Sequence, residues 1–345
     1  MQKSAYSTNV NVTASITLPK IFVAIASYRD PECQHTLRDL FAKAKHPERI
    51  FVGICWQFDP ILDADCFEYP SQYPEQVRII QYHASQSKGG CWARAEALSL
   101  KQNEDFVLMI DAHMRFVPNW DDEMLRALSM CPSSKAAITA PPPNYDPPDK
   151  LQPCENSISV MYVGALWQHD GFQPISLSGW IYKKEHWQKT PAYTPILVGN
   201  FLFGTARMFD EVPFDPHIFF RGQEPVYSAR LWTHGWDLYQ PNTTLIYHYW
   251  ESPSRDKGGA HYKANNDVQA SNRPKLALKR VRHLLGVEET QDSEALVEIE
   301  KYGMGKVRTL KEYWEFTDID LNNNTIGEKA KNGRWTAFLP KKKVV

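Results

Sequence analysis

The sequence has no apolar run long enough to cross a lipid bilayer. A membrane-spanning helix needs about 20 consecutive apolar residues, and the apolar runs of this 345-residue chain are much shorter. The N-terminal stretch MQKSAYSTNVNVTASITLPK also lacks the apolar segment of a secretory signal. We therefore expect a soluble, cytoplasmic protein with no membrane partner.

Closely spaced cysteine pairs are also missing. The six cysteines form no C-x-x-C motif and stand at positions 33, 55, 66, 91, 131 and 154. Most of them lie inside apolar segments, which is unlike the disulfide framework of a small secreted domain. This pattern favours reduced thiols in a buried core.

Neither sign of charge is in excess, because the formal net charge is −1. The basic stretch RPKLALKRVRHLLG (273–286) has leucine and valine at helical spacing, so its lysines and arginines are expected on a solvated helix face. Nucleic acid is therefore not expected as a partner. Any charged ligand must be bound by a few local groups.

The length and the hydrophobic fraction of 43% allow a substantial core. We expect an N-terminal tail over 1–19, a main domain over 20–255, a helical C-terminal extension over 256–330 and a tail over 331–345. Within the main domain, PPPNYDPPDK (141–150) predicts an irregular excursion over the surface.

Short apolar runs alternate with helical patterns in the first third of the chain. Buried strands are expected at 21–26, 50–56, 77–83 and 106–111. Asp30-Pro31 is a typical helix start, and a second helix is expected over 92–100. This order predicts an α/β fold with a largely parallel, Rossmann-like sheet and helices on both faces.

Polar residues follow three of these strands directly. They are Ser27-Tyr28-Arg29, the segment from Gln57 to Asp59, and Asp111-Ala112-His113. The carboxyl ends of parallel strands meet at one edge of a sheet, where ligands usually bind. These residues are therefore expected to contribute to one site.

Asp111 and His113 suggest a metal site. Residues two apart in an extended strand point to the same side, and a carboxylate with an imidazole suits a divalent ion such as Mn²⁺. His248, in the expected strand TLIYHYW (244–250), is a candidate third ligand. The structural alternatives are a local cap for Asp111 and an ordinary half-buried histidine for His248.

SKGGCWARAEAL predicts a phosphate-binding helix start. Lys88, Gly89 and Gly90 leave bare backbone for close approach, and Arg94 follows one turn into the helix. Such groups suit a reaction in which a nucleotide diphosphate leaves a sugar and a metal offsets the developing charge. A loose glycine turn remains the alternative.

Glu224 stands just after a glycine and at an expected helix start in FFRGQEPVYSARLWTHGW. A carboxylate is needed near the sugar, to stabilise the reacting carbon or to orient an acceptor hydroxyl. A helix cap is the structural alternative for Glu224.

The chain resembles the Skp1 hydroxyproline N-acetylglucosaminyltransferase family over about residues 20–325. The resemblance is carried by SYRDPEC, GGCWAR, IDAHMRF, NWDDEML, EVPFDP, RLWTHGWDLYQP and YGMGKVRTLKEYWEFTDIDL. That family is similar to the polypeptide GalNAc-transferases in its GT-A fold and in retaining the sugar configuration. The resemblance implies UDP-N-acetylglucosamine as donor, Mn²⁺ or Mg²⁺ as cofactor and a protein hydroxyl as acceptor.

The resemblance also implies roles for individual positions. Asp111 and His113 match the family's D-S-H metal motif with Ala112 as the spacer, and His248 matches its later metal-binding histidine. Ser27, Tyr28 and Arg29 match the first nucleotide loop. Arg94 matches an arginine near the diphosphate, and Asp59 is a weaker candidate for the uridine.

The chain departs from this family at Gly222-Gln223-Glu224, where the usual pattern is G-E-E and the first acid is lost. The assignment to Glu224 depends on the second acid being the important one. We expect a metal-dependent retaining glycosyltransferase. A metal-dependent nucleotide-sugar hydrolase and a non-catalytic sugar-nucleotide binding module are the alternatives.

Overall fold

The computed structural model describes residues 18–66, 73–152, 157–165, 176–183, 190–251 and 268–335. Its main sheet has the strand order β11-β13-β6-β12-β4-β1-β2-β3. The bounds are β1 Ile21–Tyr28, β2 Ile50–Phe58, β3 Val77–His83, β4 Phe106–Asp111, β6 Ala136–Ile138, β11 Ala192–Tyr193, β12 Phe201–Thr205 and β13 Asp237–Gln240. The four strands expected in the first third of the chain are thus present. The expectation that 77–83 is a buried strand is wrong, because β3 is the edge strand of the sheet and only Val77 of it is buried.

The sheet is mostly parallel. β1 pairs in parallel with β2 and β4, β2 with β3, and β13 with β6. β12 is inserted antiparallel between β4 and β6, and β11 is antiparallel at the edge. The strand expected over 244–250 is shorter and lies elsewhere, because β14 (Ile246–His248) pairs with β5 (Met114–Phe116) in a separate ribbon.

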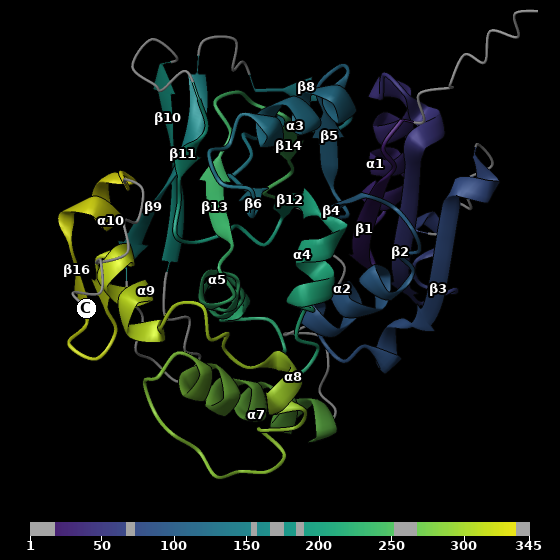
Figure 1. Ribbon diagram of the computed structural model, residues 1–345. Coiled ribbons are helices and arrows are strands. Elements are labelled where there is room, and N and C mark those ends of the chain that lie inside the picture. The colour runs from purple at the N-terminus through teal and green to yellow at the C-terminus, as the bar shows by residue number, and fades with distance from the viewer. Residues whose placement is uncertain are drawn as a thin grey trace, which may run out of the picture.

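Helices cover both faces of the sheet (Figure 1). α1 (Glu32–Lys43) and α3 (Trp120–Ser129) pack with Ile21, Val23 and Ile25 of β1 on one face. α2 (Gly90–Ser99), α4 (Ala206–Glu211) and α5 (Gln223–Thr233) pack with Phe22 and Ala24 on the other. The alternation of apolar side chains along β1 therefore contributes to two cores, as expected for a central strand.

The C-terminal part of the chain packs onto the second of these faces. It contains α7 (Val268–Leu284), α8 (Ile299–Tyr302), α9 (Leu310–Thr317), the hairpin β15 (Ile319–Asp320) and β16 (Thr325–Ile326), and α10 (Glu328–Asn332). Val281, Leu284 and Tyr313 belong to the same buried cluster as α5, and α7 forms an outer layer beyond α5 (Figure 1). The expected helical extension is present, whereas a domain boundary near 255 stays a prediction.

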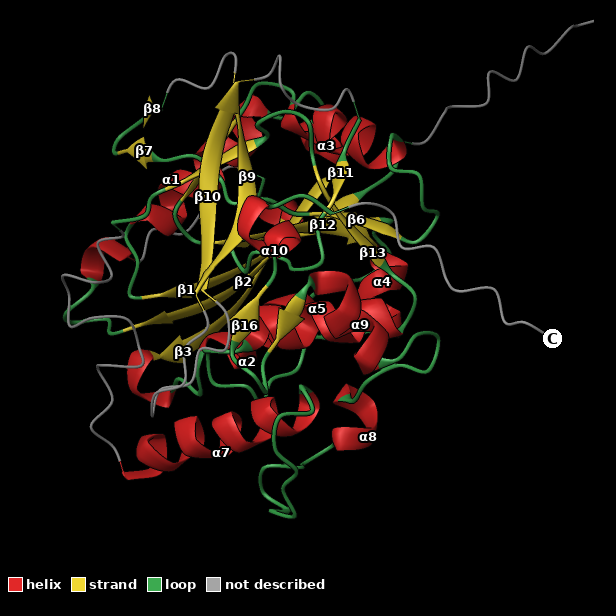
Figure 2. Cartoon of the chain, turned by 90° about the vertical axis from the view of Figure 1, so that its left-hand side faces the viewer, coloured by secondary structure: helices red, strands yellow, loops and turns green. Residues whose placement is uncertain are grey.

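The remaining strands form small ribbons. β9 (Ser157–Ala165) and β10 (Ser176–Lys183) are a long antiparallel pair beside the main sheet (Figure 2), and β7 (Tyr145–Asp146) pairs with β8 (Lys150–Leu151). Short 3₁₀ turns lie at Pro47–Arg49, Ala64–Cys66, Pro74–Gln76 and Ala84–Gln86.

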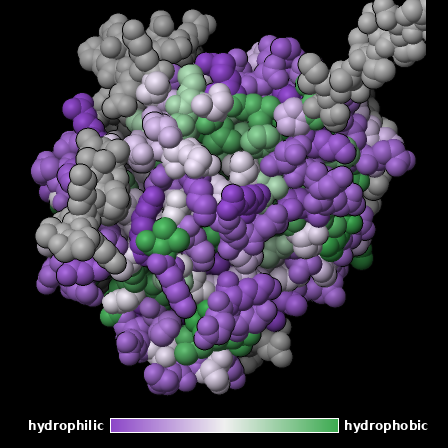
Figure 3. Space-filling model, viewed as in Figure 1, coloured by the Kyte–Doolittle hydropathy of each residue, from purple (hydrophilic) through white to green (hydrophobic). Residues whose placement is uncertain are grey.

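The surface and the interior agree with the composition. The face seen in Figure 3 is mainly hydrophilic, with apolar side chains in separate patches. In the part of the chain that the structure describes, no helix combines the length and apolarity needed to span a bilayer. The described cysteines are free thiols, and Cys33, Cys55, Cys66 and Cys91 are buried as expected.

Candidate functional site

Two sheets bring Asp111, His113 and His248 together. Asp111 ends β4, His113 stands just before β5, and His248 ends β14 opposite Met114. The amide of Tyr249 donates to the carbonyl of His113 at 3.1 Å, which holds the two histidines side by side. One ligand atom from each of the three side chains lies within 4.8 Å of the others.

The Asp111 carboxylate has two different surroundings. Its Oδ1 accepts from Nη2 of Arg94 at 2.5 Å, while its Oδ2 lies 3.3 Å from Nε2 of His248 and 3.9 Å from Nε2 of His113. Burial raises the pKa of Asp111, but the Arg94 charge and both histidines outweigh it, so the pKa lies well below its usual range. Asp111 is therefore ionised at neutral pH, with one oxygen directed at the two imidazoles.

This donor set fits a divalent cation. One carboxylate and two imidazoles are ligands that Mn²⁺ and similar ions accept, and neighbouring ligands of an octahedral ion are about 3 Å apart. The separations around Asp111 Oδ2 are of that size. Three protein ligands leave coordination positions for substrate oxygens.

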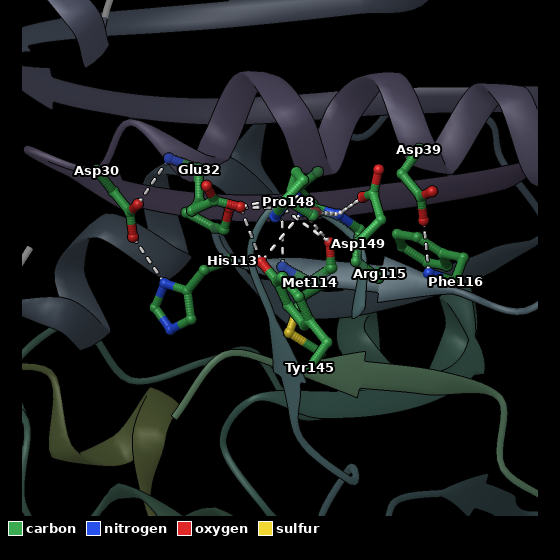
Figure 4. Close-up of polar contacts among 12 residues, drawn as sticks. Asp30, Glu32, Asp39, His113, Met114, Arg115, Phe116, Tyr145, Pro148 and Asp149 are labelled. Atoms are coloured by element: carbon green, nitrogen blue, oxygen red, sulfur yellow. Dashed lines mark hydrogen bonds and ion pairs between the residues drawn. The ribbon is translucent and has the colours of Figure 1, made fainter. Parts of the chain in front are cut away.

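His113 is oriented by a carboxylate that lies just before α1. Its Nδ1 lies 2.6 Å from Oδ2 of Asp30, while the other oxygen of Asp30 accepts from the amide of Glu32 (Figure 4). The contact places the proton on Nδ1, so Nε2 is the nitrogen that would bind a metal ion. Asp30 was expected only as a helix cap; the structure adds its contact with His113.

A buried network supports the strand that follows His113. The guanidinium of Arg115 donates to Glu32 at 2.8 Å, to the hydroxyl of Tyr145 at 3.1 Å and to the carbonyl of Pro148 at 2.8 Å (Figure 4). Arg115 is 2% exposed, and its charge is compensated by Glu32 and by Asp149, whose Oδ1 lies 2.7 Å from its Nε. These contacts join β5 to the start of α1 and to the proline-rich segment.

The proline-rich segment is irregular as expected, but the expectation that it runs over the surface is wrong for 141–143, which are buried. The carbonyl of Pro143 accepts from the amide of His248 at 2.9 Å, and the carbonyl of Pro142 accepts from the indole of Trp250 at 3.2 Å. Proline lacks an amide proton and leaves its carbonyl open as an acceptor. The segment therefore supports the strand that carries His248.

Arg94 joins this cluster to α5. Its Nη1 donates to Oε1 of Gln223 at 3.2 Å, while its Nη2 pairs with Asp111. The neutral side chain of Gln223 thus acts as an acceptor for Arg94. Burial raises the pKa of the neighbouring Glu224, and the charge of Arg94 lowers it only in part.

These residues line one pocket with a volume of about 280 Å³. Predicted site residues on its wall are Tyr28, Gly89, Gly90, Arg94, Asp111, His113, Glu224 and His248. Gly89 has φ +115°, and a Cβ there would lie 2.5 Å from the carbonyl oxygen of Phe219, so the backbone approaches closely only because this residue is glycine.

Other predicted residues lie beside the pocket, not on its wall. Ser27 is fully buried, Arg29 forms an ion pair with Asp63 at 2.8 Å, and Lys88 lies over the ring of Trp92. Asp59 accepts from the amides of Ile61 and Leu62 and thereby closes a turn. Roles for Ser27, Arg29 and Asp59 in nucleotide binding stay predictions.

Several residues on the pocket wall were not singled out from the sequence. They are Ala26, Ser87, Ala93, Val198, Gly199, Asn200, Phe220 and Trp250. Gln57, Asp30 and Gln223 also line the pocket and were noted from the sequence only as part of a strand end, as a helix start and as a departure from the family pattern. Gly199 and Asn200 were missed because they reach the pocket through the antiparallel pairing of β12 with β4. No local motif indicates that pairing.

Comparison with known proteins gives one family and one fold. A family model described as glycosyltransferase (GlcNAc) matches residues 20–72 and 68–323. Among solved structures, the crystal structure of GalNAc-T7 with UDP, GalNAc and Mn²⁺ is similar, with a TM-score of 0.57 and 13% sequence identity over 87% of this chain. The aligned region spans 56% of that protein. A search of curated proteins finds no significant match. At this identity the structural likeness concerns the fold alone, and it confirms the expected GT-A architecture.

Proposed function

Because the chain belongs to the glycosyltransferase (GlcNAc) family, we propose that it is a metal-dependent, retaining transferase of N-acetylglucosamine from UDP to a protein hydroxyl. The family and the GT-A fold make it a glycosyltransferase. The metal, the donor sugar, the retention of configuration and the acceptor are the proposed parts.

The observation that carries the proposal is the convergence of Asp111, His113 and His248 on one point of the pocket wall. These three residues would hold Mn²⁺ or Mg²⁺, which offsets negative charge on the phosphate oxygens of a bound diphosphate. The crystal of GalNAc-T7 contains UDP, GalNAc and Mn²⁺, which supports a UDP-sugar and a divalent cation here.

Arg94 supplies a fixed positive charge beside that point. Its two terminal nitrogens are held by Asp111 and Gln223, so the guanidinium cannot swing away as the leaving group develops charge. Gly89 and Gly90, at the start of α2, add bare backbone where a phosphate can approach the helix N-terminus. Together these groups stabilise the departing UDP.

Glu224 is the candidate carboxylate on the sugar side. It lines the pocket with Arg94 and Gly199, and burial raises its pKa. A carboxyl group there can accept a hydrogen bond from a sugar or acceptor hydroxyl and so orient it for attack. Trp250, 40% exposed at the same pocket, offers an aromatic face to the acceptor.

The test is UDP release from a panel of UDP-sugars, with Mn²⁺ or EDTA, followed by mass spectrometry of acceptor peptides. Peptides that contain hydroxyproline, proline, serine or threonine at one position identify the acceptor hydroxyl. We expect Mn²⁺-dependent release with UDP-N-acetylglucosamine and a mass gain on the hydroxylated peptides only. Free sugar as the sole product with every acceptor would indicate the hydrolase instead, and UDP-sugar binding that is indifferent to Mn²⁺, without turnover, would indicate the binding module.

A further inference from the structure

Two buried side chains on the pocket wall each have an amide oxygen without a hydrogen-bond donor among the described residues. Gln57 is 2% exposed and Asn200 is 5% exposed, and both line the pocket. Oε1 of Gln57 and Oδ1 of Asn200 have no hydrogen-bond partner among the residues that the structure describes. Buried polar atoms in folded proteins nearly always have a partner, so open oxygens on a pocket wall indicate groups that a ligand completes.

The strand order places these two amides on opposite sides of Asp111. Asn200 directly precedes β12, whose Phe201 pairs with Ile110, so Asn200 lies beside Asp111 on the adjacent strand. Gln57 is on β2, paired with Tyr28 of β1, and β1 separates it from β4. With strands about 4.8 Å apart, Asn200 is about 5 Å from Asp111 across the sheet. Gln57 is about 10 Å away across the sheet in the other direction, and the register places it two residues further along its strand.

This asymmetry matches the covalent order of a nucleotide sugar. The sugar is bonded directly to the distal phosphate, whereas a ribose separates the base from the phosphates. If the diphosphate lies at the Asp111 cluster, the short side toward Asn200 suits the sugar, and the longer side toward Gln57 suits the nucleoside. The sheet order therefore gives the direction in which the donor lies in the pocket.

We propose that Asn200 is a specificity-determining residue for the donor sugar, and this rests on the proposed function. Its amide oxygen accepts a hydrogen bond from a hydroxyl or acetamido N–H of the sugar. The residue before it, Gly199, has no side chain, which lets Arg94 and Glu224 pack close to the backbone beside Asn200. A sugar that lacks the matching donor leaves this buried amide unpaired, and such sites discriminate strongly between analogues.

The experiment compares Asn200→Ala with Gln57→Ala, because each variant removes one open amide from opposite ends of the same pocket. Calorimetry with Mn²⁺ gives the Kd for UDP and for UDP-N-acetylglucosamine, and kcat/KM is measured for UDP-N-acetylglucosamine, UDP-N-acetylgalactosamine and UDP-glucose. We expect Asn200→Ala to leave the Kd for UDP within about twofold and to change the ratio of kcat/KM between sugars by about tenfold or more. Gln57→Ala should weaken UDP and UDP-sugar by the same factor and leave the sugar ratios unchanged.

A purely structural role for Asn200 predicts a different result. It would lower the melting temperature and weaken UDP and UDP-sugar equally, whereas removal of an unpaired amide oxygen should leave the melting temperature unchanged. Asn200→Ser, which keeps a shorter acceptor, should show an intermediate sugar ratio and serves if the alanine variant does not fold. Unchanged sugar ratios in both Asn200 variants would overturn this inference alone. Failure of the wild-type protein to bind UDP would overturn the proposed function together with it.

Discussion

The carboxylate of Asp30 lies 2.6 Å from Nδ1 of His113, and Nε2 of the same ring faces Asp111. Asp30→Asn should weaken Mn²⁺ binding by roughly 10- to 100-fold, because asparagine has one acceptor oxygen for two donors, the amide of Glu32 and Nδ1–H of His113. Isothermal titration calorimetry with Mn²⁺ measures this change.

Asp39 provides the matched control for Asp30. It is on α1, the helix that follows Asp30, and its Oδ2 accepts from the amide of Phe116 at 2.7 Å, away from the histidine (Figure 4). Asp39→Asn should leave Mn²⁺ affinity unchanged. Equal losses of Mn²⁺ affinity in both variants would mean that the substitutions act only by destabilising the fold, not by releasing the ring of His113.

Removal of a proposed metal ligand should abolish activity without unfolding the chain. We expect Asp111→Asn and His248→Ala each to lose Mn²⁺-dependent UDP release. Each variant removes one of the three proposed ligands, and the two that remain cannot hold the ion against competition from water. Circular dichroism monitors the fold. His217→Ala, which removes a histidine that pairs with Glu298 at 3.0 Å outside the pocket, is the control. Near-normal turnover in the Asp111 variant would refute the metal assignment.

Gly199 is expected to tolerate no side chain. A Cβ there would lie 3.0 Å from Nη1 of Arg94 and 3.3 Å from Oε1 of Glu224. Gly199→Ala should lower kcat/KM by about 100-fold, since small displacements of positioned groups are costly for catalysis, while the melting temperature changes little.

Gly204, on β12, is the control for Gly199, which lies just before that strand. Its Cβ would lie 3.0 Å from the terminal methyl of Met208, a flexible side chain that can move. Gly204→Ala should keep full activity. If both alanine variants lose activity alike, the effect belongs to the strand and not to the pocket.

Glu211 gives a pH dependence of stability. Burial raises its pKa, but hydrogen bonds from Lys135, Arg207 and Trp236 outweigh that effect, so the pKa lies below its usual value. Its contribution is present above the pKa of an unfolded glutamate and is lost as the pH falls through the lower folded value. Glu211→Gln should therefore cost about 1 kcal/mol near pH 7 and less toward pH 3.

Thermal melts from pH 3 to pH 7 measure this difference between wild type and variant. Glu123→Gln, which breaks an exposed pair with Arg126, should change the melting temperature little. A deficit in Glu211→Gln that stays constant across the range would show that the carboxylate charge is not the cause.

Much of the fold follows from local patterns. The apolar runs that become β1, β2 and β4 are buried along most of their length, so composition alone indicates parallel central strands, whereas β3 at the edge is only partly buried. Asp111 and His113 could be predicted to act together, because residues two apart in an extended strand point to the same side. The part of the fold that the sequence predicted correctly thus depends on short-range periodicity.

The rest depends on contacts between distant segments. The insertion of β12 beside β4 brings Gly199 and Asn200 to the pocket, and the backbone of the proline-rich segment supports His248. Strand pairing of this kind is decided by packing across the finished sheet and leaves little trace in local propensity. Gln223 illustrates the same limit. Its hydrogen bond from Arg94 is visible only in the structure, and the sequence alone does not indicate it.

The three-residue ribbon of β5 and β14 joins histidines that are 135 positions apart in the chain, 113 and 248. A nascent polypeptide released before residue 248 lacks one of the three ligands, however well its first strands have folded. Manganese that binds only the completed ribbon stabilises the native state in proportion to its concentration. Metal titration of thermal unfolding would therefore report on the pairing of β5 with β14 as well as on the chemistry of the site.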